Sequence, residues 1–247
     1  MSAAVIEVSE LSMGWEDRVL LDKVSFRVDG GEIFAILGGS GCGKSTLMRH
    51  LIGLEVPKNG AISLFGAPHP TLEVGTPPFG VMFQGGALFG SMTVGGNVAL
   101  PLEQWTQFPY QAIGAIVRAK LRLVGLEGAE NKMPSELSGG MRKRAAIARA
   151  LALEPTLVFL DEPSAGLDPV SAAELDELIL TLNKELGLTV VIVTHELPSV
   201  FKIVSRCIML DAETKSIIAE GDPRELRDQE TDPRVHKFFH RETREVA

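Results

Sequence analysis

Cysteine is scarce in this sequence. The chain has only two cysteines, Cys42 and Cys207, and they form no C-x-x-C pair. The sequence therefore indicates neither a zinc site nor a disulfide framework. Such sparse use of cysteine is what we expect of a protein that works in a reducing compartment.

Long apolar runs and a leader segment are also missing. The apolar runs, such as LVFL at 157–160 and TVVIVT at 189–194, have the length of a strand. A helix that crosses a bilayer needs roughly 20 apolar residues. The N-terminal MSAAVIEVSE has no basic region and no apolar core, so we expect no signal peptide. If this protein works at a membrane, a partner must hold it there.

Positive charge is in deficit. Lys and Arg number 24 against 32 Asp and Glu, which gives a formal net charge of −8. This balance argues against a nucleic-acid partner, because binding to phosphates depends on Lys and Arg. The local run Arg142-Lys143-Arg144 is interpreted as a solvated helix face. With 247 residues and 45% hydrophobic content, the chain can bury a sizeable core in one large domain.

What the sequence does have is an alternation of short strands and helices. The runs IFAIL (33–37), LVFLD (157–161) and TVVIVT (189–194) are typical of parallel strands that are covered on both faces. Helical patterns separate them, so the sequence predicts a doubly wound α/β core. Further strands are expected at 5–8, 24–28, 60–66 and 79–84, and helices from 44 to about 53, at 171–186 and at 196–204.

The pattern changes between Gln84 and Pro155. Segments 109–125 and 141–152 read as helices with no buried strand between them, which predicts a helical insertion into the core. A polar tail with helical segments begins at GDPRELRD, 221–228. We therefore predict one domain over residues 1–247, divided into an α/β core (1–84 and 155–225), a helical subdomain (85–154) and a C-terminal tail (226–247).

A phosphate-binding loop is the first chemical motif. GGSGCGKS at 38–45 matches G-x-x-x-x-G-K-[ST] at every fixed position, between a predicted strand and a predicted helix. Glycines let backbone N–H groups wrap a phosphate chain, and the helix N-terminus adds partial positive charge. Lys44 can reach the β- and γ-phosphates and Ser45 can ligate Mg²⁺. Alone, the loop does not separate a kinase, GTPase, helicase or transporter ATPase.

An acid pair supplies the second motif. Asp161 ends the run LVFLD, and α/β folds bind their ligands at the carboxyl ends of such strands. Asp161 is expected to hold Mg²⁺, and Glu162 to polarise an attacking water. A GTPase would need Asn-Lys-x-Asp, and NKMP at 131–134 lacks the Asp. A small-molecule kinase would not need this acid pair.

Together these motifs resemble the nucleotide-binding subunits of ABC transporters over about residues 4–225. Further matches are Gln84 in MFQ, LSGGM at 137–141, SAGLD at 164–168 and His195 in VTHE. The resemblance implies an α/β, P-loop NTPase (RecA-like) fold with a parallel-sheet core, an antiparallel β subdomain and an inserted α-helical subdomain.

The resemblance also implies a set of site residues. The expected catalytic residues are Lys44, Gln84, Glu162 and His195, and the expected Mg²⁺ ligands are Ser45, Gln84 and Asp161. Trp15 matches the aromatic residue that such subunits often stack on adenine. The expected ATP-binding residues are Trp15, Gly38, Gly39, Ser40, Gly41, Cys42, Gly43, Lys44, Ser45, Thr46, Ser138, Gly139, Gly140 and Asp168.

In this family two subunits pair head to tail, with ATP between them. Ser138, Gly139 and Gly140 would then contact the γ-phosphate held by the partner chain, and a Cβ at either glycine would obstruct that approach. Asp168 would contact the nucleotide loop of the opposing chain. The pairing would be isologous and would create two equivalent sites.

One departure from the family pattern narrows the resemblance. Most signatures read LSGGQ, whereas this chain has Met141. LSGGM followed by RKRAAIARALALEP, with MFQGGALFGSMTVGGNVALPL at 82–102, is similar to the ATPases of MCE-type (Mla) systems, which move phospholipids or other lipids between bacterial membranes. That similarity implies an integral membrane permease dimer, an MCE-domain lipid-binding protein, and a place on the cytoplasmic face of the inner membrane.

Three alternatives stay open at this point. The chain could serve an importer for a small polar solute, although Met141 and the segment 82–102 argue against it. It could be an ABC ATPase outside transport, or a binding module without catalysis. The intact residues Lys44, Asp161, Glu162 and His195 argue against the last.

Two apolar segments carry predictions about partners. Leu88, Phe89, Met92 and Val94 are expected to form a surface for the permease, or else to pack inside the helical subdomain. In the tail, Val235, Phe238 and Phe239 have helical spacing and are expected to be buried. Tails of MCE-type ATPases reach the second subunit, which favours that site over the chain's own core or another component.

Overall fold

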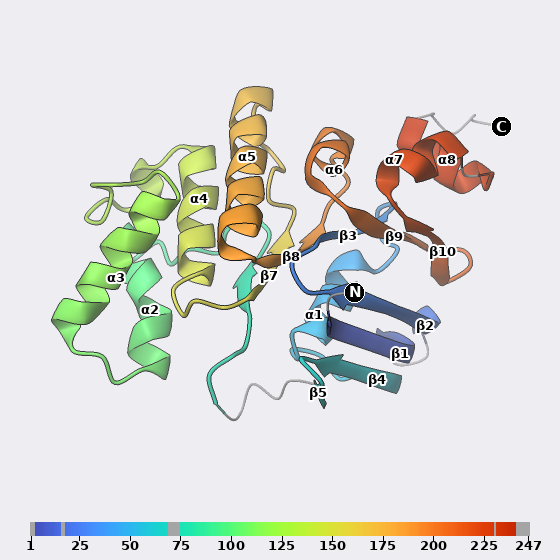
Figure 1. Cartoon of the computed structure of the whole chain (residues 1–247), viewed down its shortest axis with the longest axis horizontal. Helices are drawn as coiled ribbons and strands as arrows, with labels where there is room; N and C mark the ends of the chain where they lie inside the picture. Colours follow the sequence, from blue (N-terminus) through green and yellow to red (C-terminus); the bar gives the residue numbers. More distant parts are fainter. Residues whose placement is uncertain (1–2, 16–17, 69–74, 230, 241–247) are drawn as a thin grey trace. The chain divides into compact units, whose positions relative to one another are not determined.

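The computed structural model describes residues 3–15, 18–68, 75–229 and 231–240 (Figure 1). The chain divides into two units. The first comprises Met1–Leu72 and Val191–Ala247, and the second comprises Glu73–Val190.

An antiparallel sheet forms one part of the first unit. Its strands are β1 (Ala4–Trp15), β2 (Arg18–Asp29), β4 (Asn59–Leu64) and β5 (Ala67–Pro68), in the order β2-β1-β4-β5. Buried and exposed side chains alternate along residues 24–28 of β2, as the sequence predicts for a sheet with one covered face. The expected antiparallel β subdomain is therefore confirmed.

The first unit also contains a buried parallel pair. Every residue of β3 (Ile33–Gly38) is buried, and β3 pairs in parallel with β9 (Arg206–Asp211). β9 pairs antiparallel with β10 (Ser216–Gly221). The sequence analysis identified neither β9 nor β10.

Four short helices complete the first unit: α1 (Lys44–Leu51), α6 (Leu197–Ile203), α7 (Pro223–Gln229) and α8 (Pro233–His240). The predicted helices after the phosphate loop and near 196–204 are thus confirmed. The helical segments expected in the C-terminal tail are α7 and α8.

In the second unit, β6 (Gly80–Met82) pairs in parallel with β7 (Leu157–Asp161), whose five residues are all buried. β8 (Thr189–Val193) lies across the division between the units and is also buried throughout. The parallel, fully covered strands expected from the sequence are confirmed, and the fold is of the α/β class.

Helices make up most of the second unit. They are α2 (Val94–Trp105), α3 (Tyr110–Leu123), α4 (Gly139–Ala150) and α5 (Pro169–Leu186), with a 3₁₀ turn at Pro134–Glu136. α2, α3 and α4 pack against one another, and α5 packs against α4 (Figure 1).

The sequence analysis did not predict α2. Gly95, Gly96 and Pro101 all lie inside it and all disfavour helix. The helix forms because Thr93 caps it, with the Thr93 hydroxyl accepting a hydrogen bond from the Gly96 N–H at 3.0 Å. Packing against α3 and α4 then outweighs the weak local propensity.

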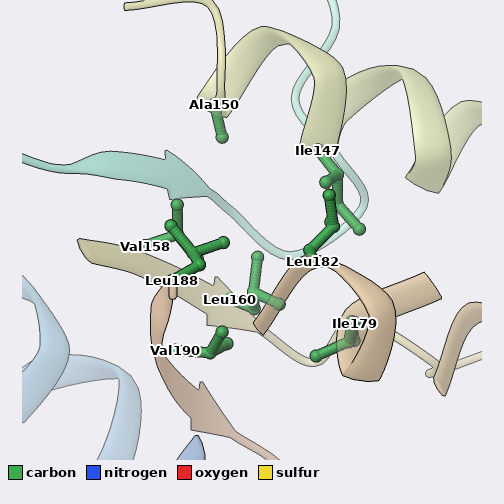
Figure 2. A pocket seen from close by; sticks show the side chains of 8 residues that line it. All are labelled: Ile147, Ala150, Val158, Leu160, Ile179, Leu182, Leu188 and Val190. Carbon is green, nitrogen blue, oxygen red and sulfur yellow. The ribbon is translucent and has the colours of Figure 1, made fainter. Parts of the chain in front are cut away.

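A small cavity shows how α4, α5, β7 and β8 meet in the core of the second unit (Figure 2). The eight side chains around it are aliphatic: Ile147, Ala150, Val158, Leu160, Ile179, Leu182, Leu188 and Val190. A cavity without polar partners has no groups to bind a water or a polar ligand. It is therefore part of the hydrophobic core.

The tail helix α8 packs on its own chain. Val235 and Phe239 are 0% and 4% exposed, and the Phe239 ring lies 5.7 Å from that of Phe201 in α6. Phe238 is half-buried, edge to face with Phe239 at 5.4 Å. The sequence favoured a second subunit as the surface that covers these side chains, but α6 and α7 of the same chain cover Val235 and Phe239. Residues 241–247 of the predicted tail lie outside the described residues.

A bidentate ion pair stabilises the start of α8. The Arg234 guanidinium contacts the Asp232 carboxylate at 2.6 Å and the Asp211 carboxylate at 3.0 Å. The contact with Arg234 lowers the pKa of Asp232 to about 2. Both acids therefore stay ionised at neutral pH and fix the helix to the end of β9.

Within the described residues, no helix is both long enough and apolar enough to cross a bilayer.

Candidate functional site

The phosphate loop connects β3 to α1 in the first unit. Its turns are left-handed at Gly41 and Gly43, with φ of 78° and 102°. The Lys44 ammonium folds back over the loop and donates hydrogen bonds to the carbonyls of Gly38 at 2.9 Å and Gly39 at 3.0 Å. The cation thus lies over the backbone of the predicted phosphate cradle.

The space around the loop fits a phosphate chain. A Cβ added at Gly38 would lie 2.5 Å from the Leu210 carbonyl oxygen and 2.6 Å from the Cys42 sulfur. A Cβ at Gly39 or Gly41 would meet no described atom within 4 Å. The loop is therefore packed on its inner side and open on the side where N–H groups could face an anion.

The residues that follow the loop are largely buried. Cys42 is 2% exposed, and burial raises the pKa of its thiol, although Lys44 opposes the shift. A protonated, buried thiol is unreactive, so Cys42 can take part through its backbone only. Thr46 is 9% exposed, and its carbonyl oxygen lies 2.8 Å from Nδ1 of His50.

Trp15 ends β1 and is 49% exposed. Two residues earlier, Met13 is buried, and its methyl carbon lies 3.1 Å from the Cβ position of Gly43. Strand β1 therefore runs beside the phosphate loop. The indole at its end is exposed and could stack on a ring.

The acid pair lies at the end of β7 in the second unit. Asp161 and Glu162 are 6% and 8% exposed. Glu162 has φ 49°, in the left-handed region that few residues other than glycine occupy. Strained backbone of this kind is frequent at functional sites.

Lys143 corrects the prediction that residues 142–144 form a solvated helix face. Its side chain is buried, and its ammonium donates a hydrogen bond to the Glu162 backbone carbonyl at 2.9 Å. Burial lowers the pKa of Lys143, and the nearby carboxylates of Glu162 and Asp161 oppose that shift. The sequence analysis missed this residue because a lysine within a cationic run gives no sign of burial.

The loop that carries Gln84 follows β6. Gln84 is exposed, and Gly86 and Ala87 have left-handed φ values of 83° and 47°. Arg149 of α4 donates hydrogen bonds to the carbonyls of Gly86 at 2.9 Å and Ala87 at 2.7 Å. Burial lowers the pKa of the Arg149 guanidinium, which remains a cation at any physiological pH.

The signature segment begins α4. Ser138 caps the helix, with its hydroxyl accepting a hydrogen bond from the Met141 N–H at 3.2 Å. A Cβ at Gly139 would lie 3.3 Å from a methyl of Leu167, and one at Gly140 would lie 3.6 Å from Cβ of Ser171. The second distance is ordinary contact and the first involves only a movable methyl group. The fold of this chain therefore makes little demand for glycine here.

Asp168 has a structural role that the sequence analysis did not predict. It caps α5, since its carboxylate accepts hydrogen bonds from the N–H groups of Val170 and Ser171, each at 3.0 Å. The bonds from Ser171 and Val170 lower the pKa of Asp168, which is exposed. Nearby, the Ser164 hydroxyl oxygen is buried without a hydrogen-bond partner among the described residues.

His195 follows β8 and presents an exposed ring, with Nε2 3.7 Å from the Glu196 carboxylate. It lies in the first unit with Trp15 and the phosphate loop. Gln84, the signature, the acid pair and Asp168 lie in the second unit. Each unit thus holds part of the predicted site.

Across the part of the chain that the structure describes, no three His, Cys, Asp or Glu side chains are grouped as a metal site. Mg²⁺ usually binds one or two carboxylates together with substrate phosphates. A single buried carboxylate such as Asp161 suits that chemistry.

The predicted permease surface is divided by the structure. Phe89 is 53% exposed, whereas Val94 is completely buried in α2. The Phe89 backbone is held by Asn97, whose side chain accepts from the Phe89 N–H at 2.7 Å and donates to its carbonyl at 3.1 Å. Val94 therefore belongs to the core, while Phe89 is available to a partner.

Comparison with known proteins gives close relatives over nearly the whole chain. The family model described as ABC transporter matches residues 21–165. The intermembrane phospholipid transport system ATP-binding protein MlaF of Escherichia coli K12 is 41% identical over 242 residues, which cover 96% of this chain and 89% of that protein. The probable ribonucleotide transport ATP-binding protein mkl of Mycobacterium tuberculosis (strain H37Rv) is 40% identical, over 95% of this chain and 66% of that protein.

Solved structures of ATP-binding cassettes are also similar to this chain. CbiO1 from Clostridium perfringens, described as part of the ABC transporter complex cbiONQ, superposes with a TM-score of 0.82 and 31% identity, over 92% of this chain and 91% of that one. The ATP-binding cassette MJ0796, solved as a dimer in a post-hydrolysis state bound to ADP and Pi, superposes with a TM-score of 0.78 and 29% identity. The match covers 88% of this chain and 98% of that one. A family match across more than half of the sequence, with relatives of this identity along nearly all of it, means that this chain belongs to the ABC transporter family, as an ATP-binding ATPase subunit.

Proposed function

We propose that this protein hydrolyses ATP as a head-to-tail pair and so powers the movement of phospholipid through a membrane permease. The observation that supports phospholipid as the transported substrate is the 41% identity to MlaF along 96% of the chain. The hydrolytic chemistry rests on the phosphate loop and the buried acid pair.

The proposed roles follow from the position of each group. Lys44 neutralises the β- and γ-phosphates, and the loop N–H groups bind their oxygens. Ser45, Gln84 and Asp161 would hold Mg²⁺, which would supply charge stabilisation at the phosphates. Glu162 accepts a proton from the attacking water, and His195 donates a hydrogen bond to the γ-phosphate.

The second subunit completes each site in this proposal. Gly139 and Gly140 meet little of their own chain, which supports an approach by something from outside it. Together with the Ser138 hydroxyl, their N–H groups at the start of α4 suit a γ-phosphate. The related cassette MJ0796 is a dimer with ADP and Pi. Asp168 reaches the opposing nucleotide loop in addition to capping α5.

The membrane partners follow from the same proposal. The relatives are ATP-binding proteins of transport systems, which supports a permease dimer as the partner of this protein at a bilayer. We place it on the cytoplasmic face of the inner membrane, where ATP is available. The exposed Phe89 beside the Gln84 loop is a contact for the permease, and an MCE-domain protein carries the lipid beyond it.

A second candidate is the transport of a polar solute. It is favoured by the mycobacterial relatives, which are named for probable ribonucleotide transport and are 40% identical. The two cargos can be separated by isolating the protein from membranes with its co-expressed neighbours and measuring ATPase activity. Phospholipid vesicles should stimulate the rate under our proposal, whereas stimulation by ribonucleotides alone would replace it with this alternative.

The chemical assignment is tested by Glu162→Gln. The amide cannot accept a proton, so hydrolysis should fall at least about 100-fold. ATP binding should persist, because the phosphate loop is unchanged, and size-exclusion chromatography should reveal an ATP-dependent dimer. Lys44→Ala serves as the contrasting variant and should lose ATP binding itself. Near-normal turnover in Glu162→Gln would remove Glu162 from the mechanism.

A further inference from the structure

Lys143 holds the backbone of the residue that we assign to water activation. Its ammonium donates to the Glu162 carbonyl at 2.9 Å, and the side chain is only 7% exposed. Burying an ammonium is costly even when it is hydrogen-bonded. A methionine of similar length would fill this place without that cost. The buried charge therefore indicates a role beyond packing.

The backbone that Lys143 contacts needs to be held. Glu162 has φ 49°, which a residue with a Cβ seldom adopts without support. The preceding residue, Asp161, is the last residue of β7, and the following residue, Pro163, has a fixed φ. A donor that fixes the direction of the Glu162 carbonyl also fixes the peptide plane, and with it the direction in which the carboxylate leaves the chain.

Helix α4 makes a similar contact with the other catalytic loop of this unit. Arg149 donates to the carbonyls of Gly86 and Ala87, just after Gln84. Lys143 lies four residues after Gly139, and residues at this spacing share a face of a helix. The helix that begins with the signature glycines therefore holds the Glu162 backbone through a cation one turn further on.

The neighbouring cations of α4 have other contacts. The guanidinium of Arg142 donates to the Leu137 carbonyl at 2.6 Å. Arg144 donates to the Val124 carbonyl at 3.2 Å and pairs with Glu174 at 3.1 Å. Within the run of three cations, the contact with Glu162 is made by Lys143.

We propose that Lys143 is a positioning residue for hydrolysis: it fixes Glu162 in its left-handed conformation and links that conformation to the placement of the signature helix. The proposal rests on the proposed role of Glu162. It predicts that loss of the ammonium lowers turnover without weakening ATP binding.

The test compares three variants of the full chain, isolated with its membrane partners. Lys143→Met removes the charge and should lower kcat at least tenfold while KM for ATP stays within threefold. Lys143→Arg restores a cationic donor and should recover most of that loss. Arg144→Met is the matched control, since it removes one charge from the same helix, and its kcat should stay within twofold of the unmutated chain.

A double variant shows whether Lys143 acts through Glu162. In a Glu162→Gln background, Lys143→Met should cause no further fall in the residual rate, because the group it positions is already gone. If Lys143→Met does not fold, Lys143→Gln, which keeps a neutral donor, should fold and give an intermediate kcat with unchanged KM.

The outcomes separate this proposal from the proposed function. Normal turnover in Glu162→Gln would overturn the role of Glu162 itself. If Glu162→Gln is inactive but Lys143→Met has normal kcat, the positioning role is wrong. A rise in KM at constant kcat, a failure of Lys143→Arg to recover activity, or an additive effect in the double variant would overturn it equally.

Discussion

The phosphate loop and the signature helix both contain adjacent glycines, but the structure gives Gly38 and Gly140 opposite surroundings. At Gly38 the backbone is left-handed, with φ 144°, and a Cβ would overlap the Leu210 carbonyl oxygen and the Cys42 sulfur. At Gly140 the backbone is helical, and a Cβ would meet Cβ of Ser171 at 3.6 Å, an ordinary contact.

The contrast separates two reasons for glycine. At Gly38 the fold of the chain itself excludes a side chain, because its own atoms occupy the space that a Cβ would fill. In the signature the chain would accept alanine, and helix propensity would favour alanine by about 1 kcal/mol. Under our proposal, the requirement for glycine at 139 and 140 comes from a ligand held by the partner subunit.

The largest effect is expected for Gly38→Ala. The new methyl group would overlap backbone and the Cys42 side chain, and alanine would be strained at this φ. We expect a loss of about 3 kcal/mol in the free energy of unfolding, together with loss of ATP binding. Urea unfolding measures the first and nucleotide binding the second. A Gly38→Ala chain as stable as the unmutated one would show that the fold does not require glycine at this position.

Gly140→Ala tests the other side of the comparison. The chain should be as stable as before or gain up to about 1 kcal/mol, which is roughly 2–4 °C in Tm for a protein of this size. Hydrolysis should nevertheless fall about tenfold or more, while each chain still binds ATP through its own loop. Scanning calorimetry and ATPase assays give the two values. Full activity in Gly140→Ala would show that nothing external needs this glycine.

The smallest effect is expected at Asp168, and it separates two roles. Asp168→Ala should lose the cap of α5 and lower the Tm, whereas Asp168→Asn should keep most of the cap. If Asp168 also contacts the partner, Asp168→Asn should keep its Tm but lower ATPase activity severalfold. Equal activity in Asp168→Asn and the unmutated chain would leave capping as its role.

Lys143 shows why part of the site could not be predicted from the sequence. Arg142, Lys143 and Arg144 are consecutive, so their side chains leave the helix in three directions about 100° apart. The apolar positions of α4 include Ala145, Ala146, Ile147, Ala148 and Ala150, a stripe too broad to indicate which cation faces inward. Only the packing of α4 against the end of β7 gives that direction.

The sequence failed to predict the surface that covers the tail and the presence of α2 for related reasons. The spacing of Val235 and Phe239 predicts burial, and both are buried, but spacing cannot identify the surface that covers them. In α2, Gly95, Gly96 and Pro101 disfavour helix locally, and the contacts that compensate come from α3 and α4. In both cases the deciding partner is distant in sequence.

The sequence by itself determined the motifs whose meaning is local. GGSGCGKS between a strand and a helix, and the acid pair after a buried run, depend on neighbours within a few residues, so their spacing alone predicts a nucleoside triphosphate site. The tertiary structure decided which cation is buried against Glu162, which face covers α8, and which glycines the fold itself requires. These depend on atoms that distant segments bring within a few ångströms, and periodicity along a chain carries no record of such contacts.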